Sequence, residues 1–179
     1  MNQEDVNSAI ADLIEAWHHR PYDAFSCNWI CLLRLANLLD PSSEHKRLVQ
    51  LLQILPEESA THVLEDPSVE ALIGIQPPLE SIISSRHERL DEQKARRLIE
   101  TTRAQKKRDP KAAIISLTEI LKRIRNRREH GFKTPDGPRD EEILGNGAAI
   151  LRTMVLIAAE TLIQKCGENE GKEHQRTNS

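Results

Sequence analysis

Residues 109–131 read DPKAAIISLTEILKRIRNRREHG, and this stretch indicates the class of fold. Its apolar residues recur every three or four positions, which is the spacing of a helix with one buried face. They are Ile114, Leu117, Ile120, Leu121 and Ile124. Asp109 is a residue type that caps helix N-termini, and Pro110 suits the first helical position. Gly131 suits the position just after a helix. The stretch therefore predicts one long amphipathic helix.

The same period extends over much of the chain. It predicts helices over about residues 5–18, 23–39, 44–55 and 138–165, with Ser43 as a cap and Pro21 closing the first helix. Aromatic residues make up only 3% of the 179 residues, and there are only 7 glycines. Strands of sandwiches and barrels need aromatic and β-branched residues and glycine turns, so an all-β fold is disfavoured. We expect an all-α helical bundle.

Residues 56–108 depart from this pattern. Prolines at 56, 67, 77 and 78 predict short helical turns, such as one over residues 68–73, and little regular structure between them. Residues 79–107 predict a charged helix with few apolar anchors, packed on one side only. We therefore expect a single domain over residues 1–167 with an irregular, charged helical insertion at 56–108. Residues 168–179 are polar and are expected to form a disordered tail.

Composition sets the expected surroundings of the protein. We find no run of about 18 apolar residues, the length that spans a membrane. The first residues are polar and acidic, unlike a secretory signal. Three cysteines form no paired framework, which favours a reducing compartment. These features predict a cytoplasmic protein with no membrane association.

Charge is distributed unevenly along the chain. Residues 1–85 hold 4 basic and 13 acidic residues, whereas residues 86–128 hold 15 basic and 6 acidic ones. Such a basic block can bind a polyanion even though the whole chain has a net charge of -3. It can equally be a solvated helical face with ion pairs between successive turns.

Several chemistries lack their motifs. The chain has no phosphate-binding GxxxxGK[ST] loop, GxSxG elbow or HExxH helix. The run from Gly145 to Gly147 lacks the third glycine and the preceding strand of a dinucleotide site, so we interpret it as close helix packing. Cys27 and Cys31 lie on one helical face without two further zinc ligands, which favours buried thiols. We therefore expect no cofactor and no metal.

Arg125 and His130 form the most informative pair. At 100° per residue, Arg125 borders the apolar stripe and Arg128 extends it, whereas Arg123 and Arg127 point to solvent. His130 would lie about 140° from Arg125 on an unbroken helix. The two groups of one chain converge only if the helix unwinds, or two chains supply them across a two-fold axis. The alternative is a surface arginine and a histidine that complements the helix dipole.

The run from Ile124 to Gly131, followed by a Pro/Asp/Gly loop, by residues 139–142 and by an amphipathic helix, resembles the HEPN superfamily. Its signature is an arginine, a polar residue and, a few positions on, a histidine; here these are Arg125, Asn126 and His130. The run from Tyr22 to Ile30 is similar to the aromatic-containing first core helix of Apea-like HEPN proteins. The resemblance covers roughly residues 10–165, apart from 56–108.

The resemblance implies a dimeric all-α bundle that often cuts RNA without a metal. Arg125 and His130 would be catalytic, with Asn126 holding a ribose or phosphate oxygen or bracing the histidine. The cations that could contact the RNA backbone are Lys122, Arg123, Arg127, Arg128 and Lys133.

The biological setting implied is a toxin or phage-defence nuclease, with a minimal nucleotidyltransferase as a possible antitoxin. The alternatives are a non-catalytic HEPN module that binds RNA, nucleotide or a partner protein, and a purely structural helical adaptor.

Overall fold

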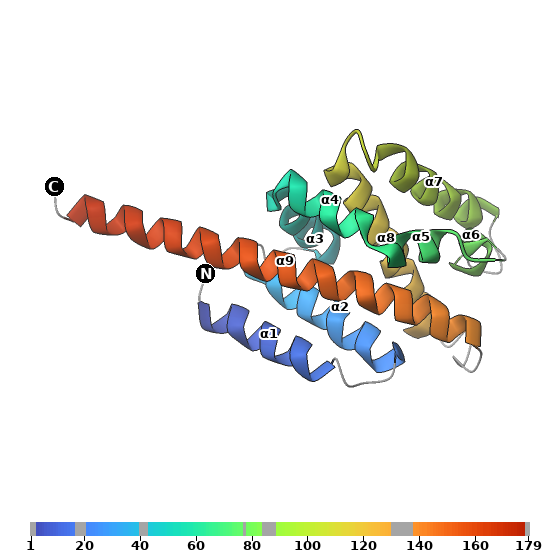
Figure 1. Cartoon of the computed structure of the whole chain (residues 1–179), viewed down its shortest axis with the longest axis horizontal. Coiled ribbons are helices and arrows are strands. Elements are labelled where there is room, and N and C mark those ends of the chain that lie inside the picture. The colour runs from blue at the N-terminus through green and yellow to red at the C-terminus, as the bar shows by residue number, and fades with distance from the viewer. Residues whose placement is uncertain are drawn as a thin grey trace.

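The structure, a computed structural model, describes residues 3–16, 21–39, 43–76, 78–83, 89–129 and 138–177. The described residues are helical and contain no strand, which confirms the expected all-α fold (Figure 1). The helices are α1 Gln3–Ala16, α2 Pro21–Asn37, α3 Glu44–Ile54, α4 Glu57–Glu65, α5 Pro67–Ile73, α6 Leu79–Ile83, α7 Arg89–Gln105, α8 Pro110–Glu129 and α9 Pro138–Thr177.

Helix α8 begins as the sequence predicts. The side chain of Asp109 accepts a hydrogen bond from the backbone N–H of Ala112 at 2.9 Å, and Pro110 is the first helical residue. The apolar stripe of α8 is buried along its whole length, from Ile114 to Ile124. It packs chiefly against α7 and α4, with α3 and α6 beside them. The candidate site residues near Ile124 therefore lie on a helix of the buried core.

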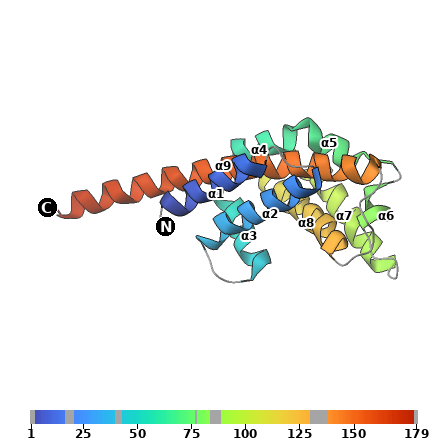
Figure 2. The ribbon, with the colours of Figure 1, turned by 90° about the horizontal axis from the view of Figure 1, so that it is seen from below.

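Helix α9 is the second organising element. It packs along α2 and also contacts α1 and α5, so the first and last helices of the chain lie side by side (Figures 1 and 2). A Cβ added at Gly147 would lie only 2.6 Å from Cε2 of the buried Phe25. The interpretation of this glycine as a site of close helix packing is therefore confirmed.

The short helix expected over residues 68–73 is confirmed as α5, but the low order expected elsewhere in residues 56–80 is wrong. Helices α4, α5 and α6 lie within residues 57–83 and bury Ala60, Val63, Leu64, Val69, Leu72, Leu79 and Ile83. Pro56, Pro67 and Pro78 stand at the starts of helices rather than interrupting them. Pro56 is the residue before α4, and Pro67 opens α5, where Asp66 caps the helix by accepting from the N–H of Ser68 at 2.8 Å.

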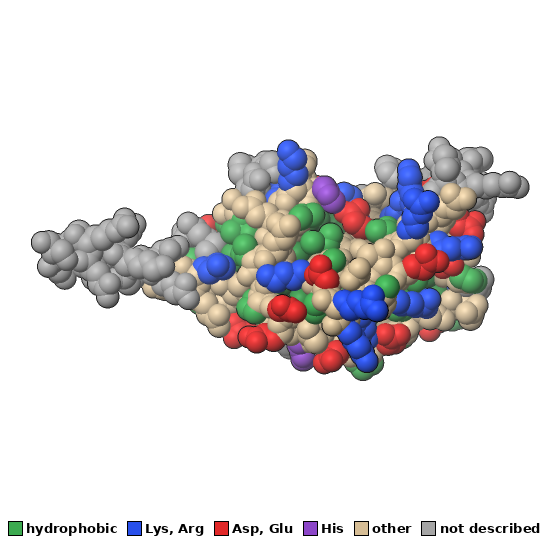
Figure 3. All heavy atoms as spheres, turned by 90° about the horizontal axis from the view of Figure 1, so that it is seen from above, with side chains coloured by type: hydrophobic (Ala, Val, Ile, Leu, Met, Phe, Trp, Pro, Cys, Tyr) green, Lys and Arg blue, Asp and Glu red, His purple; other side chains and the backbone are tan. Residues whose placement is uncertain are grey.

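The single charged helix expected over residues 79–107 is instead α6 and α7. Among the described side chains of α7, the buried face is narrow and consists of Ala95, Ile99 and Thr102. Helix α7 packs mainly on α8 and α6. On the side of the molecule drawn in Figure 3, Lys and Arg side chains are interspersed with Asp and Glu.

The ends of two other helices also differ from expectation. Helix α2 begins at Pro21 itself, because proline fits the first turn of a helix. Helix α9 continues past Gly167 to Thr177, where a disordered tail was expected. One glycine costs a helix only about 1 kcal/mol, so it does not end the helix by itself. Figure 1 shows the last turns of α9 projecting beyond the bundle.

One helix of the described residues is long and apolar enough to cross a membrane by length and composition. It spans Pro138–Gly167, with a mean hydropathy of 1.4 over its best window, and 56% of that window is buried in the bundle. The sequence of this helix contains no unbroken apolar run, because polar residues are interspersed along it. A core helix packed on both sides has the same composition.

The three cysteines form no disulfide bond. Cys31 and Cys166 are buried and Cys27 is half-buried, which confirms the interpretation of Cys31 as a core thiol. Burial, and secondarily the neighbouring Cys27, raises the pKa of the Cys31 thiol to about 11. Within the described part of the chain, no three His, Cys, Asp or Glu residues are placed to hold a metal ion.

Candidate functional site

Arg125 lies in the last turns of α8 with its guanidinium against α2. The side chain is 16% exposed, and its guanidinium carbon is 5.0 Å from the centre of the buried Trp29 ring. A planar cation over an indole face is attracted by the ring's negative face and cannot swing freely. The structure thus agrees with the helical wheel, which placed Arg125 at the edge of the buried stripe.

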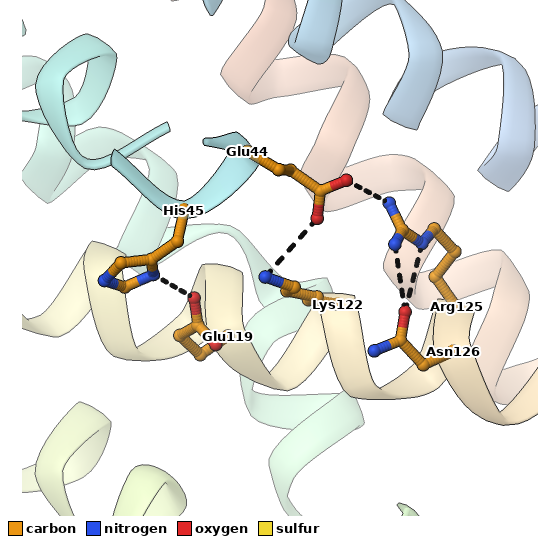
Figure 4. Close-up of polar contacts among 6 residues, drawn as sticks. All are labelled: Glu44, His45, Glu119, Lys122, Arg125 and Asn126. Atoms are coloured by element: carbon orange, nitrogen blue, oxygen red, sulfur yellow. Dashed lines mark hydrogen bonds and ion pairs between the residues drawn. The ribbon is translucent and has the colours of Figure 1, made fainter. Parts of the chain in front are cut away.

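A carboxylate that the sequence did not point to contacts this guanidinium. Glu44, the first residue of α3, accepts a hydrogen bond at Oε2 from Nη1 of Arg125 at 2.9 Å (Figure 4). Its other oxygen, Oε1, lies 3.4 Å from Nζ of Lys122. The carboxylate therefore lies between two cations of α8.

The pKa of Glu44 reflects these contacts. Burial raises the pKa of this carboxyl, but the hydrogen bond from Arg125 and the positive charges of Arg125 and Lys122 outweigh burial. The resulting pKa lies below the ordinary value of 4.5. Glu44 is thus a carboxylate at neutral pH.

Asn126 contacts its neighbour Arg125. Its Oδ1 accepts hydrogen bonds from Nε at 3.3 Å and from Nη2 at 3.0 Å (Figure 4). Asn126 therefore holds the guanidinium edge formed by Nε and Nη2, and Glu44 holds Nη1. These contacts position Arg125. The role expected of Asn126 toward a ribose or toward His130 stays a prediction, because His130 lies outside the described residues.

Two of the candidate RNA-contacting cations of α8 lie beside acidic side chains. Lys122 points toward Glu44. Arg123 donates to Oδ1 of Asp91 on α7 at 2.5 Å and is only 22% exposed, so its expected orientation to solvent is wrong. The helical wheel failed there because α7 covers a second face of α8.

Four of the expected site residues cannot be placed. His130, Lys133 and the side chains of Arg127 and Arg128 lie outside the described residues. Helix α8 itself is continuous to Glu129. The helix does not unwind before Glu129. Residues at its end therefore project in the directions of a regular helix, at 100° per residue from Arg125.

Two further polar residues lie near Glu44 in the sequence of α3. His45 Nδ1 lies 2.9 Å from Oε1 of Glu119, which forms a second polar contact between α3 and α8 (Figure 4). Arg47 lies one turn beyond Glu44 on α3, a spacing that places two side chains on the same side of a helix. Among the described residues, Nε of Arg47 is buried with no hydrogen-bond partner.

The site therefore draws its side chains from three separate parts of the sequence. Trp29 comes from α2, Glu44 from the start of α3, and Arg125 and Asn126 from the last turns of α8. Glu44 is 81 residues from Arg125, and no local pattern could have linked the two. No family model, curated protein or solved structure matches the chain.

Proposed function

We propose that the protein is a metal-independent endoribonuclease of the HEPN type. The observation that carries this proposal is the state of Arg125. Its guanidinium is charged, mostly buried and oriented by Trp29, Asn126 and Glu44, five residues before His130. A cation held in this way is pre-organised to bind phosphate, because little side-chain freedom remains to be lost.

The chemistry needs no metal because RNA carries its own nucleophile. The 2′-hydroxyl loses its proton and attacks the adjacent phosphorus, and the bond to the 5′-oxygen of the next nucleotide breaks. His130 accepts the hydroxyl proton or donates one to the leaving oxygen. Arg125 stabilises the extra negative charge of the five-coordinate phosphorus. The products are a 2′,3′-cyclic phosphate and a 5′-hydroxyl.

Assembly as a homodimer completes this proposal. A regular helix directs Arg125 and His130 of one chain apart, whereas a two-fold axis beside Arg125 brings two copies of each group to one cleft. Arg127, Arg128 and Lys133 would line that cleft and contact the RNA backbone. In the cell we propose a cytoplasmic toxin or phage-defence role, with a minimal nucleotidyltransferase as antitoxin.

The decisive experiment incubates RNA with the wild type and with His130→Ala and Arg125→Ala in excess EDTA, and identifies the product ends. We expect cyclic phosphate ends from the wild type and no cleavage by either variant. Arg127→Ala is the control, with weaker binding but retained cleavage. Equal cleavage by wild type and His130→Ala, or cleavage that EDTA stops, would exclude this mechanism.

A second candidate is a non-catalytic module that binds RNA, nucleotide or a partner protein. It is favoured by the three nitrogens of Arg125 that already donate to Glu44 and Asn126, since such contacts also suit a structural arginine. Retained RNA binding with no cleavage by the wild type would support this candidate.

A further inference from the structure

The carboxylate of Glu44 lies where an anionic ligand of the α8 cations would lie. It is reached from α3, 81 residues away in sequence, and its two oxygens point separately at Arg125 and Lys122 (Figure 4). Arginine and lysine one turn apart on a helix form a site that accepts a carboxylate or a phosphate equally well.

The carboxylate satisfies this site incompletely. Oε1 of Glu44 is buried and lies 3.4 Å from the Lys122 ammonium, without forming a hydrogen bond. Nε of Arg47, on the same side of α3, is buried without an acceptor among the described residues. Two cations of α8 thus contact a group with two oxygens and one charge, and α3 carries a third cation, Arg47, one turn from Glu44. A phosphodiester has the same charge and offers its non-bridging oxygens in a tetrahedral arrangement.

The Glu44 side chain can rotate away from Arg125 and Lys122 without displacement of α3. Glu44 is the first residue of α3, where a side chain has no preceding helical turn to pack against. Helix α3 is also held by the buried Leu48, Leu51 and Leu52, and by the contact of His45 with Glu119. Rotation of one partly exposed side chain therefore frees the anion position.

We infer that Glu44 occupies the phosphate position between Lys122 and Arg125, so that an RNA phosphate must displace it to bind. Glu44 is then an internal competitor that weakens binding, rather than a group that contacts RNA. This inference rests on the proposed function for the identity of the ligand, and it predicts that removal of the carboxylate charge strengthens binding.

The test measures the affinity of a short oligouridylate with 2′-O-methyl groups, which cannot be cleaved, by fluorescence anisotropy. Glu44→Gln should bind about tenfold tighter than the wild type, the scale of one charged hydrogen bond released to the ligand. Glu119→Gln is the matched control, because it removes one charge from the other α3–α8 contact without touching Arg125. It should stay within about twofold of the wild type. In an Arg125→Ala background, Glu44→Gln should lose most of its gain.

Where the wild type binds the oligouridylate, equal or weaker binding by Glu44→Gln would overturn the inference, as would an equal gain from Glu119→Gln. Glu44→Ser provides a second variant if the glutamine variant does not fold. Unfolding of both variants by circular dichroism would show a structural carboxylate and also overturn it.

Titration with inorganic phosphate separates the two proposals. A phosphate affinity that rises in Glu44→Gln, with no RNA binding by any variant, would support the displaced carboxylate and contradict the ribonuclease. RNA cleavage that His130→Ala abolishes, with no gain from Glu44→Gln, would leave the ribonuclease standing alone.

Discussion

Arg125 makes three kinds of contact at once: a stacking contact with Trp29, an ion pair with Glu44 and hydrogen bonds to Asn126. The position of Arg125 on its helix could be predicted, because the 3.6-residue period places it beside Ile124. The Asn126 contact needs only adjacent residues. The Glu44 contact could not be predicted, because the approach of α3 to α8 depends on the packing of the whole core.

Glu44 should contribute stability that depends on pH. Because its pKa is lower in the folded protein than the ordinary 4.5, the contribution is complete above pH 4.5 and is lost as the pH falls through the folded pKa. Urea unfolding should show the wild type to be more stable than Glu44→Gln at neutral pH, with the difference closing in acid. A stability difference between the wild type and Glu44→Gln that stays constant as the pH falls below 4.5 would contradict the ion pair.

Gly147 should tolerate no side chain. A Cβ there overlaps the ring of Phe25, which is fully buried and cannot move aside, so Gly147→Ala should destabilise the protein by about 1–3 kcal/mol in urea unfolding. Gly167→Ala, on the same helix, is the control. A Cβ at Gly167 meets nothing within 4 Å, and alanine should add up to about 1 kcal/mol of stability there. Equal effects at both glycines would contradict the close approach of α2 and α9.

At the scale of the elements, local capping could be predicted and the meaning of proline could not. Asp109 and Pro110 form the expected start of α8, since a cap involves residues only three apart. Pro56 and Pro67 follow the same rule, but a proline ends one helix as readily as it begins the next. Whether a proline begins or ends a helix depends here on tertiary packing, such as the burial of Val63. The local sequence around a proline does not show that packing.

Helix α7 should be less protected than α8. Its buried face consists of Ala95, Ile99 and Thr102, whereas α8 buries a stripe of leucine and isoleucine. Less apolar area buried means a smaller free energy of local opening. Hydrogen exchange should therefore be faster over residues 91–105 than over residues 114–124. Equal rates would show that α7 opens only with the whole molecule.

At the scale of the whole molecule, the all-α class followed from the helical period and from the scarcity of aromatic residues. The order of packing did not. Arg123 shows why: its wheel position faced away from the stripe, yet α7 covers that face and Asp91 binds the guanidinium. A helical wheel identifies the most apolar face of a helix, but not how many neighbours the helix has.

The proposed homodimer can be tested without any assay of activity. Light scattering after size exclusion should give twice the mass of one chain, and Arg125→Ala should shift the equilibrium toward the monomer if the axis lies beside that residue. Lys94→Ala, at an exposed position of α7, is the control and should leave the mass unchanged. A monomer at every concentration tested would exclude a shared cleft.

The pairing of α2 with α9 has a consequence for the synthesis of the protein. The two helices lie side by side, although more than a hundred residues separate Asn28 from Ala148, whose carbonyl it binds at 2.9 Å. A nascent chain therefore exposes Phe25 and Trp29 until α9 has left the ribosome. Such late contacts slow folding and leave apolar surface open to chaperones. Helices α1 and α2 can therefore pack against α9 only after nearly all the residues of the bundle have been synthesised.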